Sequence, residues 1–180
     1  MRLRSFTLIV AALALPAAAH AQSSATVDSA RTLLAKYRDP VVAAANGYLS
    51  TTACMAFSNG AMGVHFINMG TVGQPLDPAK PQVLMYEPVG DSLRLIAAEW
   101  FVPVSPQVTA APSLFGEHFD GPMDGHAPIM PADLKHYDLH VWLWKSNPAG
   151  MFNPVNPNVS CGKYPYSHKE NTAPTRAHAH

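Results

Sequence analysis

The sequence has little charge, only two cysteines and none of the motifs that identify common enzyme classes. Charged residues occupy 13% of the 180 positions, and none of them form the basic stripe that binds nucleic acid or anionic membranes. There is no G-x-S-x-G, no phosphate-cradling glycine loop, no dinucleotide-binding fingerprint and no C-x-x-C-H. These absences argue against nucleic-acid partners, serine hydrolases, nucleotide-dependent enzymes and c-type cytochromes.

Long hydrophobic runs are also missing after residue 21. Before that point, Arg2 and Arg4 precede an apolar core at residues 6–15, and Ala19 and Ala21 form a small-x-small cleavage site. This order predicts a signal peptide over residues 1–21, because the core is too short to serve as a membrane anchor. The alanine-rich leader is typical of bacterial export. We therefore expect a periplasmic or secreted protein with no membrane insertion after signal removal.

The two cysteines are Cys54 and Cys161, and neither belongs to a C-x-x-C motif. Because exported proteins meet an oxidising environment, we predict a Cys54–Cys161 disulfide that ties the start of the domain to its end. In the chain-entropy model such a long loop would gain about 4 to 5 kcal/mol of stability. Buried free thiols, or a reactive thiol, are the alternatives.

Helical periodicity is confined to the beginning of the predicted mature chain. Residues 27–38 place Ala30, Leu33, Leu34 and Tyr37 on one face. Asp39 and Pro40 then have the residue types of a helix N-cap and first position. The sequence predicts a helix pair or one kinked helix.

Strand patterns follow at residues 61–68, 82–87, 93–103 and 137–145, with a turn-forming cluster at 88–92. The fold class expected is α+β, with the N-terminal helix or helix pair packed on one mainly antiparallel sheet. We predict a single domain over residues 22–166, irregular loops at 114–133 and 147–158, and a disordered tail over 167–180.

Three of these apolar runs each carry one ionisable residue: His65, Glu99 and His140. Titratable groups are costly to bury without a partner, and two imidazoles with one carboxylate form a common divalent-metal ligand set. Three hypotheses remain open. The residues bind a metal (Zn, Fe, Mn or Cu), they form a metal-free acid–base site, or they form a buried polar network that holds the sheet together.

Strand alternation predicts which residues share a face with each of the three. His65 is expected beside Gly63 and Ile67. The expected neighbours of Glu99 are Leu93, Leu95, Ala97 and Phe101, and those of His140 are Asp138, Trp142 and Trp144.

The loop at 114–133 contributes further polar candidates. Glu117 and His118 are the first candidates for a catalytic acid or base beside the metal, because Phe115 and Phe119 would anchor the loop near them. A solvated surface loop is the alternative. The loop also carries Asp120, Asp124 and His126.

Aromatic residues cluster in the same strand patterns. Trp100, Phe101, Trp142 and Tyr86 can line a pocket for a small-molecule ligand. Core packing is the competing interpretation, because aromatic side chains dominate buried area in most domains.

The most specific sequence patterns are G-x-M-G-x-H around His65 and L-H-V-W-x-W-K-x-N-P around His140. With these patterns, about residues 30–161 of the chain resemble an uncharacterised family of small exported proteins found in bacteria and some fungi. The resemblance implies a single exported domain. No activity is established for that family, so the resemblance implies no reaction, substrate or cofactor.

The sequence thus predicts a small exported protein with a divalent-metal pocket on a sheet, acting as a metal-dependent enzyme on an unknown substrate. The alternative is a non-catalytic binding or structural protein of the cell envelope, whose His/Glu cluster is a buried polar network. A third possibility is a metal-independent hydrolase or lyase.

Overall fold

The computed structural model describes residues 26–126, 130–170, 174 and 176. The predicted signal peptide and most of the predicted disordered tail lie outside the described residues. Within the described ranges, no helix is both long and apolar enough to cross a membrane.

Two short helical segments precede the sheet. Residues 26–34 are α-helical and continue into a 3-10 turn, η1 (Ala35–Arg38). The Asp39 side chain then accepts a hydrogen bond of 2.8 Å from the Val41 N–H and caps α2 (Pro40–Ala45). The predicted helix pair is confirmed, except that Leu33 is exposed while its neighbour Leu34 is fully buried.

One seven-stranded sheet follows, in the order β7-β8-β4-β3-β2-β1-β9. All neighbouring pairs are antiparallel except β1 and β9, which run parallel. Strands β5 and β6 form a separate two-stranded ribbon. The strands are β1 (Leu49–Phe57), β2 (Gly60–Ile67), β3 (Val83–Val89), β4 (Ser92–Pro103), β5 (Ser113–Leu114), β6 (Glu117–His118), β7 (Asp120–Met123), β8 (His136–Val141) and β9 (Ser167–Lys169). A short 3-10 turn, η2 (Met69–Thr71), follows β2.

The α+β class with one mainly antiparallel sheet is therefore confirmed, and four local expectations are wrong. Strand β1 was not predicted, and its pairing with β2 is interrupted between Ser50 and Cys54. Strand β8 stops at Val141, because the next N–H, that of Trp142, donates to the Met151 carbonyl. The loop at 114–133 contains three short strands, and the tail contains β9. Strands this short depend on a neighbouring strand and carry no sequence pattern of their own.

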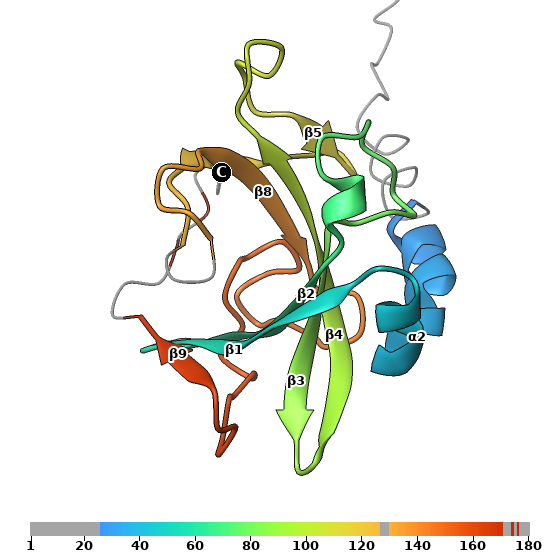
Figure 1. The fold of residues 1–180 in the computed structure, drawn as a ribbon, viewed down its shortest axis with the longest axis vertical. Coiled ribbons are helices and arrows are strands. Elements are labelled where there is room, and N and C mark those ends of the chain that lie inside the picture. The colour runs from blue at the N-terminus through green and yellow to red at the C-terminus, as the bar shows by residue number, and fades with distance from the viewer. Residues whose placement is uncertain (1–25, 127–129, 171–173, 175, 177–180) are drawn as a thin grey trace, which may run out of the picture.

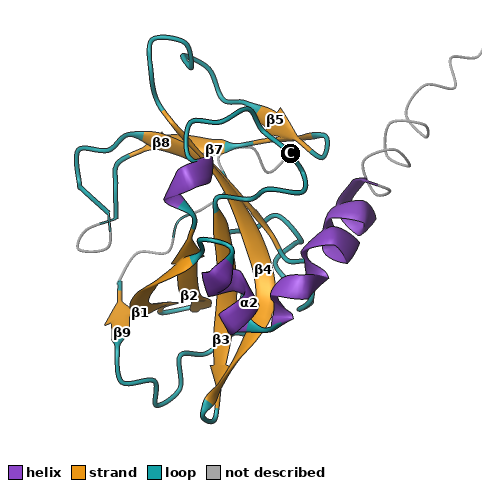
Figure 2. Ribbon diagram, turned by 45° about the vertical axis from the view of Figure 1, so that its right-hand side comes forward, coloured by secondary structure: helices purple, strands orange, loops and turns teal. Residues whose placement is uncertain are grey.

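The sheet curls away from the helices. In Figure 1 the helices lie on the right, while β8 and the β1–β9 edge turn toward the left. Figure 2 shows β7 and β8 at one end of the sheet and β1 and β9 at the other. The curl brings strands that are far apart in the sheet order around one hollow.

Cross-strand pairing assigns each residue to a face. One face carries His65, which pairs with Met85, and Glu99, which pairs with His140. The other face carries Tyr86, whose hydroxyl donates to the Tyr37 carbonyl of η1 at 2.6 Å and so meets the helices. We call these the site face and the helix face.

A register shift in β4 changes one prediction about these faces. Met85 pairs with Ala97, but Tyr86 pairs with Leu95, so Ile96 is an extra residue in β4. Ala97 and Phe101 share the face of Glu99 as predicted. Leu93 and Leu95 instead belong to the helix face, because the extra residue inverts the alternation beyond it.

Gly63 explains how β2 comes close to β3 at this point. Its φ is +97°, and a Cβ there would lie 2.5 Å from the Tyr86 carbonyl oxygen. Only glycine combines this backbone conformation with so close an approach. The residue thus fixes the pairing that sets His65 opposite Met85.

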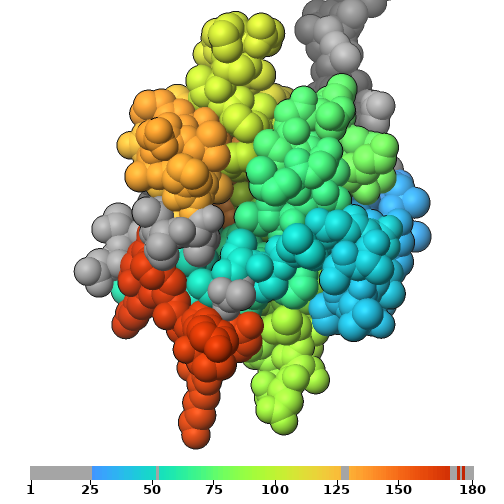
Figure 3. Space-filling model, in the orientation of Figure 1, coloured from blue at the N-terminus to red at the C-terminus, as the bar shows by residue number. Residues whose placement is uncertain are grey.

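The predicted disulfide is present: Cys54 of β1 is bonded to Cys161, with Cα atoms 5.7 Å apart. It holds the long loop after β8 against the sheet. A bridge between Ala61 and Asn156 adds two backbone hydrogen bonds of 3.2 Å. On the other side of the molecule, the segment around η2 (green) lies beside α2 (cyan) in Figure 3, where the Asn68 amide donates to the Asn46 carbonyl.

Candidate metal centre

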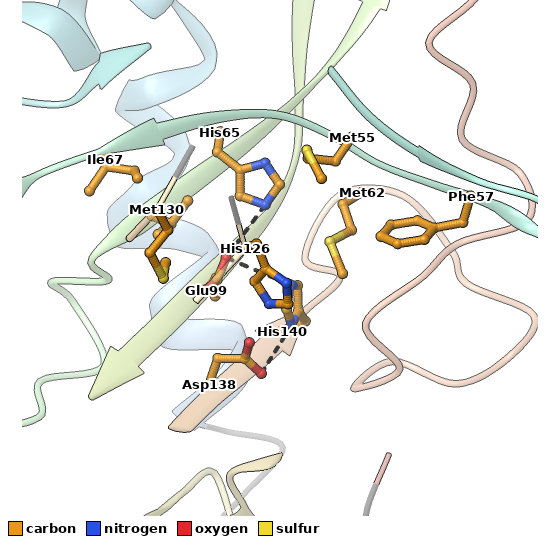
Figure 4. A pocket seen from close by; sticks show the side chains of 11 residues that line it. Met55, Phe57, Met62, His65, Ile67, Glu99, His126, Met130, Asp138 and His140 are labelled. Carbon is orange, nitrogen blue, oxygen red and sulfur yellow. Dashed lines mark ion pairs between the residues drawn. The ribbon is translucent and has the colours of Figure 1, made fainter. Parts of the chain in front are cut away.

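The three residues singled out by the sequence meet on the site face. His65 comes from β2, Glu99 from β4 and His140 from β8. Glu99 and His140 are direct cross-strand partners, and the side chain of His65 reaches across β3 toward them (Figure 4). The predicted convergence is confirmed, since one donor atom of each residue lies within 4.8 Å of the other two.

The spacing of the donor atoms suits a metal better than hydrogen bonds. Glu99 Oε2 lies 3.6 Å from His65 Nε2 and 3.6 Å from His140 Nε2. Hydrogen bonds between such groups are about 2.7 to 3.2 Å long. Two ligands bound to a tetrahedral Zn²⁺ at about 2 Å lie about 3.3 Å apart. The triad therefore leaves room for a cation between its donor atoms.

All three side chains are withdrawn from solvent. Their exposed fractions are 9% for His65, 7% for Glu99 and 3% for His140. His140 Nε2 is buried and makes no hydrogen bond with any described residue. A buried polar atom that makes no hydrogen bond costs about 1 to 3 kcal/mol, so a ligand that coordinates this nitrogen would be favourable.

A small pocket adjoins the triad. It offers water-sized molecules a volume of about 40 Å³. One water needs about 10 to 15 Å³ on this measure, so the pocket accommodates a cation with a few small ligands but no large organic molecule. Apart from the titratable residues, its walls are thioether, aromatic and aliphatic side chains: Met55, Phe57, Met62, Ile67, Val83 and Met130.

Asp138 lies next to the triad, beside the ring nitrogen of His140 that does not face Glu99. Its Oδ1 lies 3.6 Å from His140 Nδ1, and its Oδ2 lies 3.7 Å from His136 Nε2. His136 Nδ1 in turn lies 3.1 Å from the Leu134 carbonyl oxygen. A carboxylate on the far nitrogen of a histidine fixes the ring orientation and raises its basicity, as in carboxylate–histidine–zinc arrangements.

The pKa values of the two imidazoles, His65 and His140, are shifted in opposite directions. Burial, together with the nearby His140, lowers the pKa of His65 to about 3, so His65 is neutral at pH 7. Burial also disfavours the charge on His140, but the Glu99 and Asp138 carboxylates outweigh it and raise the pKa of His140 to about 9. Only an unprotonated imidazole binds metal, so His65 is ready to bind and His140 must first lose a proton.

The carboxyl groups differ in the same way. Burial raises the pKa of Glu99 to about 7, against the attraction of His140. Burial also acts to raise the pKa of Asp138, but His140 and His136 overcome it and hold that pKa below its usual range. Asp138 is therefore charged throughout the neutral pH range, and Glu99 gains its charge only near neutrality.

A second group with metal-ligand chemistry adjoins the first. It consists of His126, His136 and Asp138, again with one donor atom of each within 4.8 Å of the others. His126 is one of the loop residues expected from the sequence, whereas His136 was not expected in the site. The missed signal is the H-x-D-x-H alternation at 136–140, which puts His136, Asp138 and His140 on one face of β8.

The two loop residues predicted to act beside the metal, Glu117 and His118, have partners elsewhere. Glu117 is held by Arg176 Nη2 at 3.0 Å, and the exposed His118 shares a 2.8 Å hydrogen bond with Ser113. Neither side chain lines the pocket, so the structure does not bring these two candidates to the triad. Their anchors Phe115 and Phe119 are buried as predicted.

The four aromatic residues proposed to line the pocket are also absent from its walls. Trp100 donates to the Asp77 carbonyl, and Tyr86 donates to Tyr37, both on the helix face. Trp142 donates to the Asn153 carbonyl in the loop after β8. Phe101 stacks against His136, with ring centroids 4.8 Å apart. Core packing, the alternative interpretation, describes them correctly.

Comparison of the chain with protein-family models, curated proteins and solved structures finds no significant match, so the argument for function comes from the chemistry of the site alone.

Proposed function

We propose that this is an exported protein that binds one divalent cation through His65, Glu99 and His140, and that the bound cation serves a metal-dependent reaction on a small molecule. The observation that carries the proposal is the convergence of three donor atoms within 4.8 Å of one another, with each imidazole nitrogen 3.6 Å from Glu99 Oε2, in a buried site on the sheet. The disulfide supports an oxidising compartment such as the periplasm or the exterior.

The ligand set narrows the choice of cation. Two imidazoles and one carboxylate suit Zn²⁺, Fe²⁺, Mn²⁺ or Cu²⁺, whereas Mg²⁺ and Ca²⁺ favour oxygen ligands. Three protein ligands leave at least one coordination position, and the pocket adjoins it. A cation in such a position polarises a substrate oxygen or lowers the pKa of a bound water.

The pocket restricts the substrate. Only a reacting group of a few heavy atoms fits the space of about 40 Å³, and the methionine-rich wall gives it an apolar surrounding. The rest of a larger substrate would remain outside the pocket. Asp138 would hold the His140 ring through Nδ1 while Nε2 binds the cation.

The competing function is a cation-free polar network, favoured by the complementary charges of His140, Glu99 and Asp138. In that case the three residues stabilise the sheet and bind nothing. The two functions differ in a simple way: a network predicts that divalent cations leave the melting temperature unchanged, whereas a metal site predicts that they raise it.

The experiment uses untagged protein lacking residues 1–21, treated with a chelator and then exposed to Zn²⁺, Fe²⁺, Mn²⁺ or Cu²⁺ salts. We expect at least one tightly held equivalent of one of these ions by elemental analysis after desalting, with a raised melting temperature. Glu99→Gln should remove one equivalent while keeping the volume of the side chain.

The matched control is His168→Gln. His168 also faces a carboxylate, with Nε2 lying 3.6 Å from Glu170 Oε1, but it lies on β9 and lines no part of the pocket. This variant should bind cations as the parent does. Metal below a tenth of an equivalent, with no thermal shift for any of the four ions, would establish the cation-free network instead.

A further inference from the structure

We propose that His126, His136 and Asp138 form a second divalent-cation site, and that Asp138 links it to the first. The second site stands on its own geometry, whereas the link between the sites rests on the function proposed above. The donors of the second site are two nitrogens and one oxygen, so the expected ligand is a cation of the Zn²⁺ or Cu²⁺ class.

The orientation of the His136 ring is the main evidence for the second site. The Leu134 carbonyl oxygen lies 3.1 Å from Nδ1 and can only accept, so Nδ1 bears the hydrogen. In the neutral ring, Nε2 then presents a lone pair to Asp138 Oδ2, 3.7 Å away. Two acceptors that face each other inside a protein repel unless a cation stands between them. Either a proton on His136 or a metal ion fills that role.

A proton alone satisfies this pair poorly. With Nε2 protonated, a contact of 3.7 Å is too long for a hydrogen bond between buried charges, which is usually 2.7 to 2.9 Å. The side chains are 1% and 6% exposed, so bulk water does not supply the missing partner. Two ligands of one tetrahedral cation lie about 3.3 Å apart, which is closer to the observed 3.7 Å than the length of a charged hydrogen bond is.

His126 supplies the third donor from the loop after β7. Its ring lies edge-on to that of His136, with centroids 5.5 Å apart. Two backbone hydrogen bonds hold this position, from Gly125 N–H to the Ala132 carbonyl and from Met130 N–H to the His126 carbonyl. A Cβ at residue 125 would overlap the Pro131 carbonyl, so the close approach requires glycine.

Asp138 joins the two sites through its two oxygens. Oδ1 faces Nδ1 of His140, whose Nε2 belongs to the first site, while Oδ2 faces His136 in the second. His126 also lines the pocket beside His65, Glu99 and His140 (Figure 4). Two cations would thus border one pocket, an arrangement that can hold both the attacking and the leaving oxygen of a hydrolytic reaction.

The test counts bound Zn²⁺ in the untagged, chelator-treated chain without residues 1–21. We expect two equivalents in the parent protein by calorimetry and by elemental analysis. His136→Gln and His126→Gln should each remove one equivalent and spare the other. A His178→Gln/His180→Gln double variant, measured alongside, subtracts zinc bound by the terminal histidines.

Asp138→Asn tests the link. This variant should lose the second equivalent and bind the first about 10- to 100-fold more weakly, the usual effect of removing a carboxylate behind a metal-bound histidine. Unchanged affinity at the first site would overturn the link. Because His126 is only partly buried, His126→Gln remains informative even where a change at the fully buried His136 impairs folding.

The outcomes separate the two proposals. One equivalent in the parent, lost in His65→Gln but kept in both His126→Gln and His136→Gln, would overturn the second site and leave the first intact. One equivalent lost in His136→Gln but kept in His65→Gln would support the second site and overturn the first. No bound zinc in the parent would overturn both.

Discussion

The two faces of the sheet solve the problem of buried polar groups in opposite ways. On the helix face, Tyr86 and Trp100 each place their polar atom within 2.9 Å of a backbone carbonyl. On the site face, the ring nitrogens of His65 and His140 stay 3.6 Å from the nearest carboxylate oxygens. The same strands therefore carry satisfied polar atoms on one side and incompletely satisfied ones on the other.

This difference separates stability from function. Native proteins pair nearly all of their buried polar groups, and the helix face follows that rule. Groups left at long distances in a buried pocket are a recognised mark of a functional site, because a ligand completes their interactions. We infer that the helix face maintains the fold, whereas the site face carries the groups whose interactions the proposed cation would complete.

The largest expected effect comes from the helix face. Leu84 is fully buried there, and Leu84→Ala should lower the free energy of unfolding by about 3 kcal/mol through lost burial and the resulting cavity. Zinc affinity at pH 7 should stay within twofold of the parent. Denaturant unfolding and calorimetry measure the two quantities. A large loss of zinc affinity would show that the two faces are not separate.

An intermediate effect comes from pH acting on the site face of the cation-free protein. The pKa of His140 is raised to about 9 in the native state, so the native protein holds a proton that the unfolded chain releases near pH 6.5. This contribution to stability is complete below pH 6.5 and is lost as the pH rises toward 9. Burial lowers the pKa of His136, but the nearby Asp138 carboxylate and the Leu134 carbonyl outweigh it and raise that pKa, so His136 acts in the same direction.

For each such group, the free energy of unfolding falls by up to about 1.4 kcal/mol per pH unit as the pH rises through that range. Chelator-treated protein should therefore unfold at lower denaturant concentration at pH 7.5 than at pH 6.5, and His140→Gln should show a shallower decline. Equal stability of the parent at both pH values would contradict the assigned charge on His140. Zinc binding should strengthen over the same range as His140 releases its proton.

The smallest expected effect tests a single satisfied group. Tyr86→Phe removes the hydroxyl that donates to the Tyr37 carbonyl and should cost about 1 kcal/mol of unfolding free energy. Metal content should not change. A loss of bound metal in this variant would mean that the contact between helix and sheet positions the site as well as the fold.

Local patterns were enough to predict the main elements of this fold. The Asp39-Pro40 pair marked the start of α2, and alternation marked β2, β3 and β4, because caps and pleats depend on near neighbours in the chain. The same patterns missed β1 and β9. Strand β9 has three residues, and its pairing with β1 is a contact across more than a hundred positions of sequence.

The site shows the same division. His65, Glu99 and His140 stood out because each interrupts an apolar run, and burial of a titratable group calls for a reason. The sequence did not indicate which residues line the pocket. Trp100 and Tyr86 resembled wall residues in the sequence, but strand parity places them on the helix face.

The sequence by itself determined the helix pair, most of the sheet, the two cysteines that form the bridge, and the three side chains that stand out chemically. Only the tertiary structure decided that β8 pairs with β4 and that the curled sheet brings His126 and Asp138 to the same pocket. The physical reason is the distance along the chain over which each kind of interaction acts. Periodicity and capping act over a few residues, whereas the choice of strand partner depends on how the whole chain buries its apolar surface.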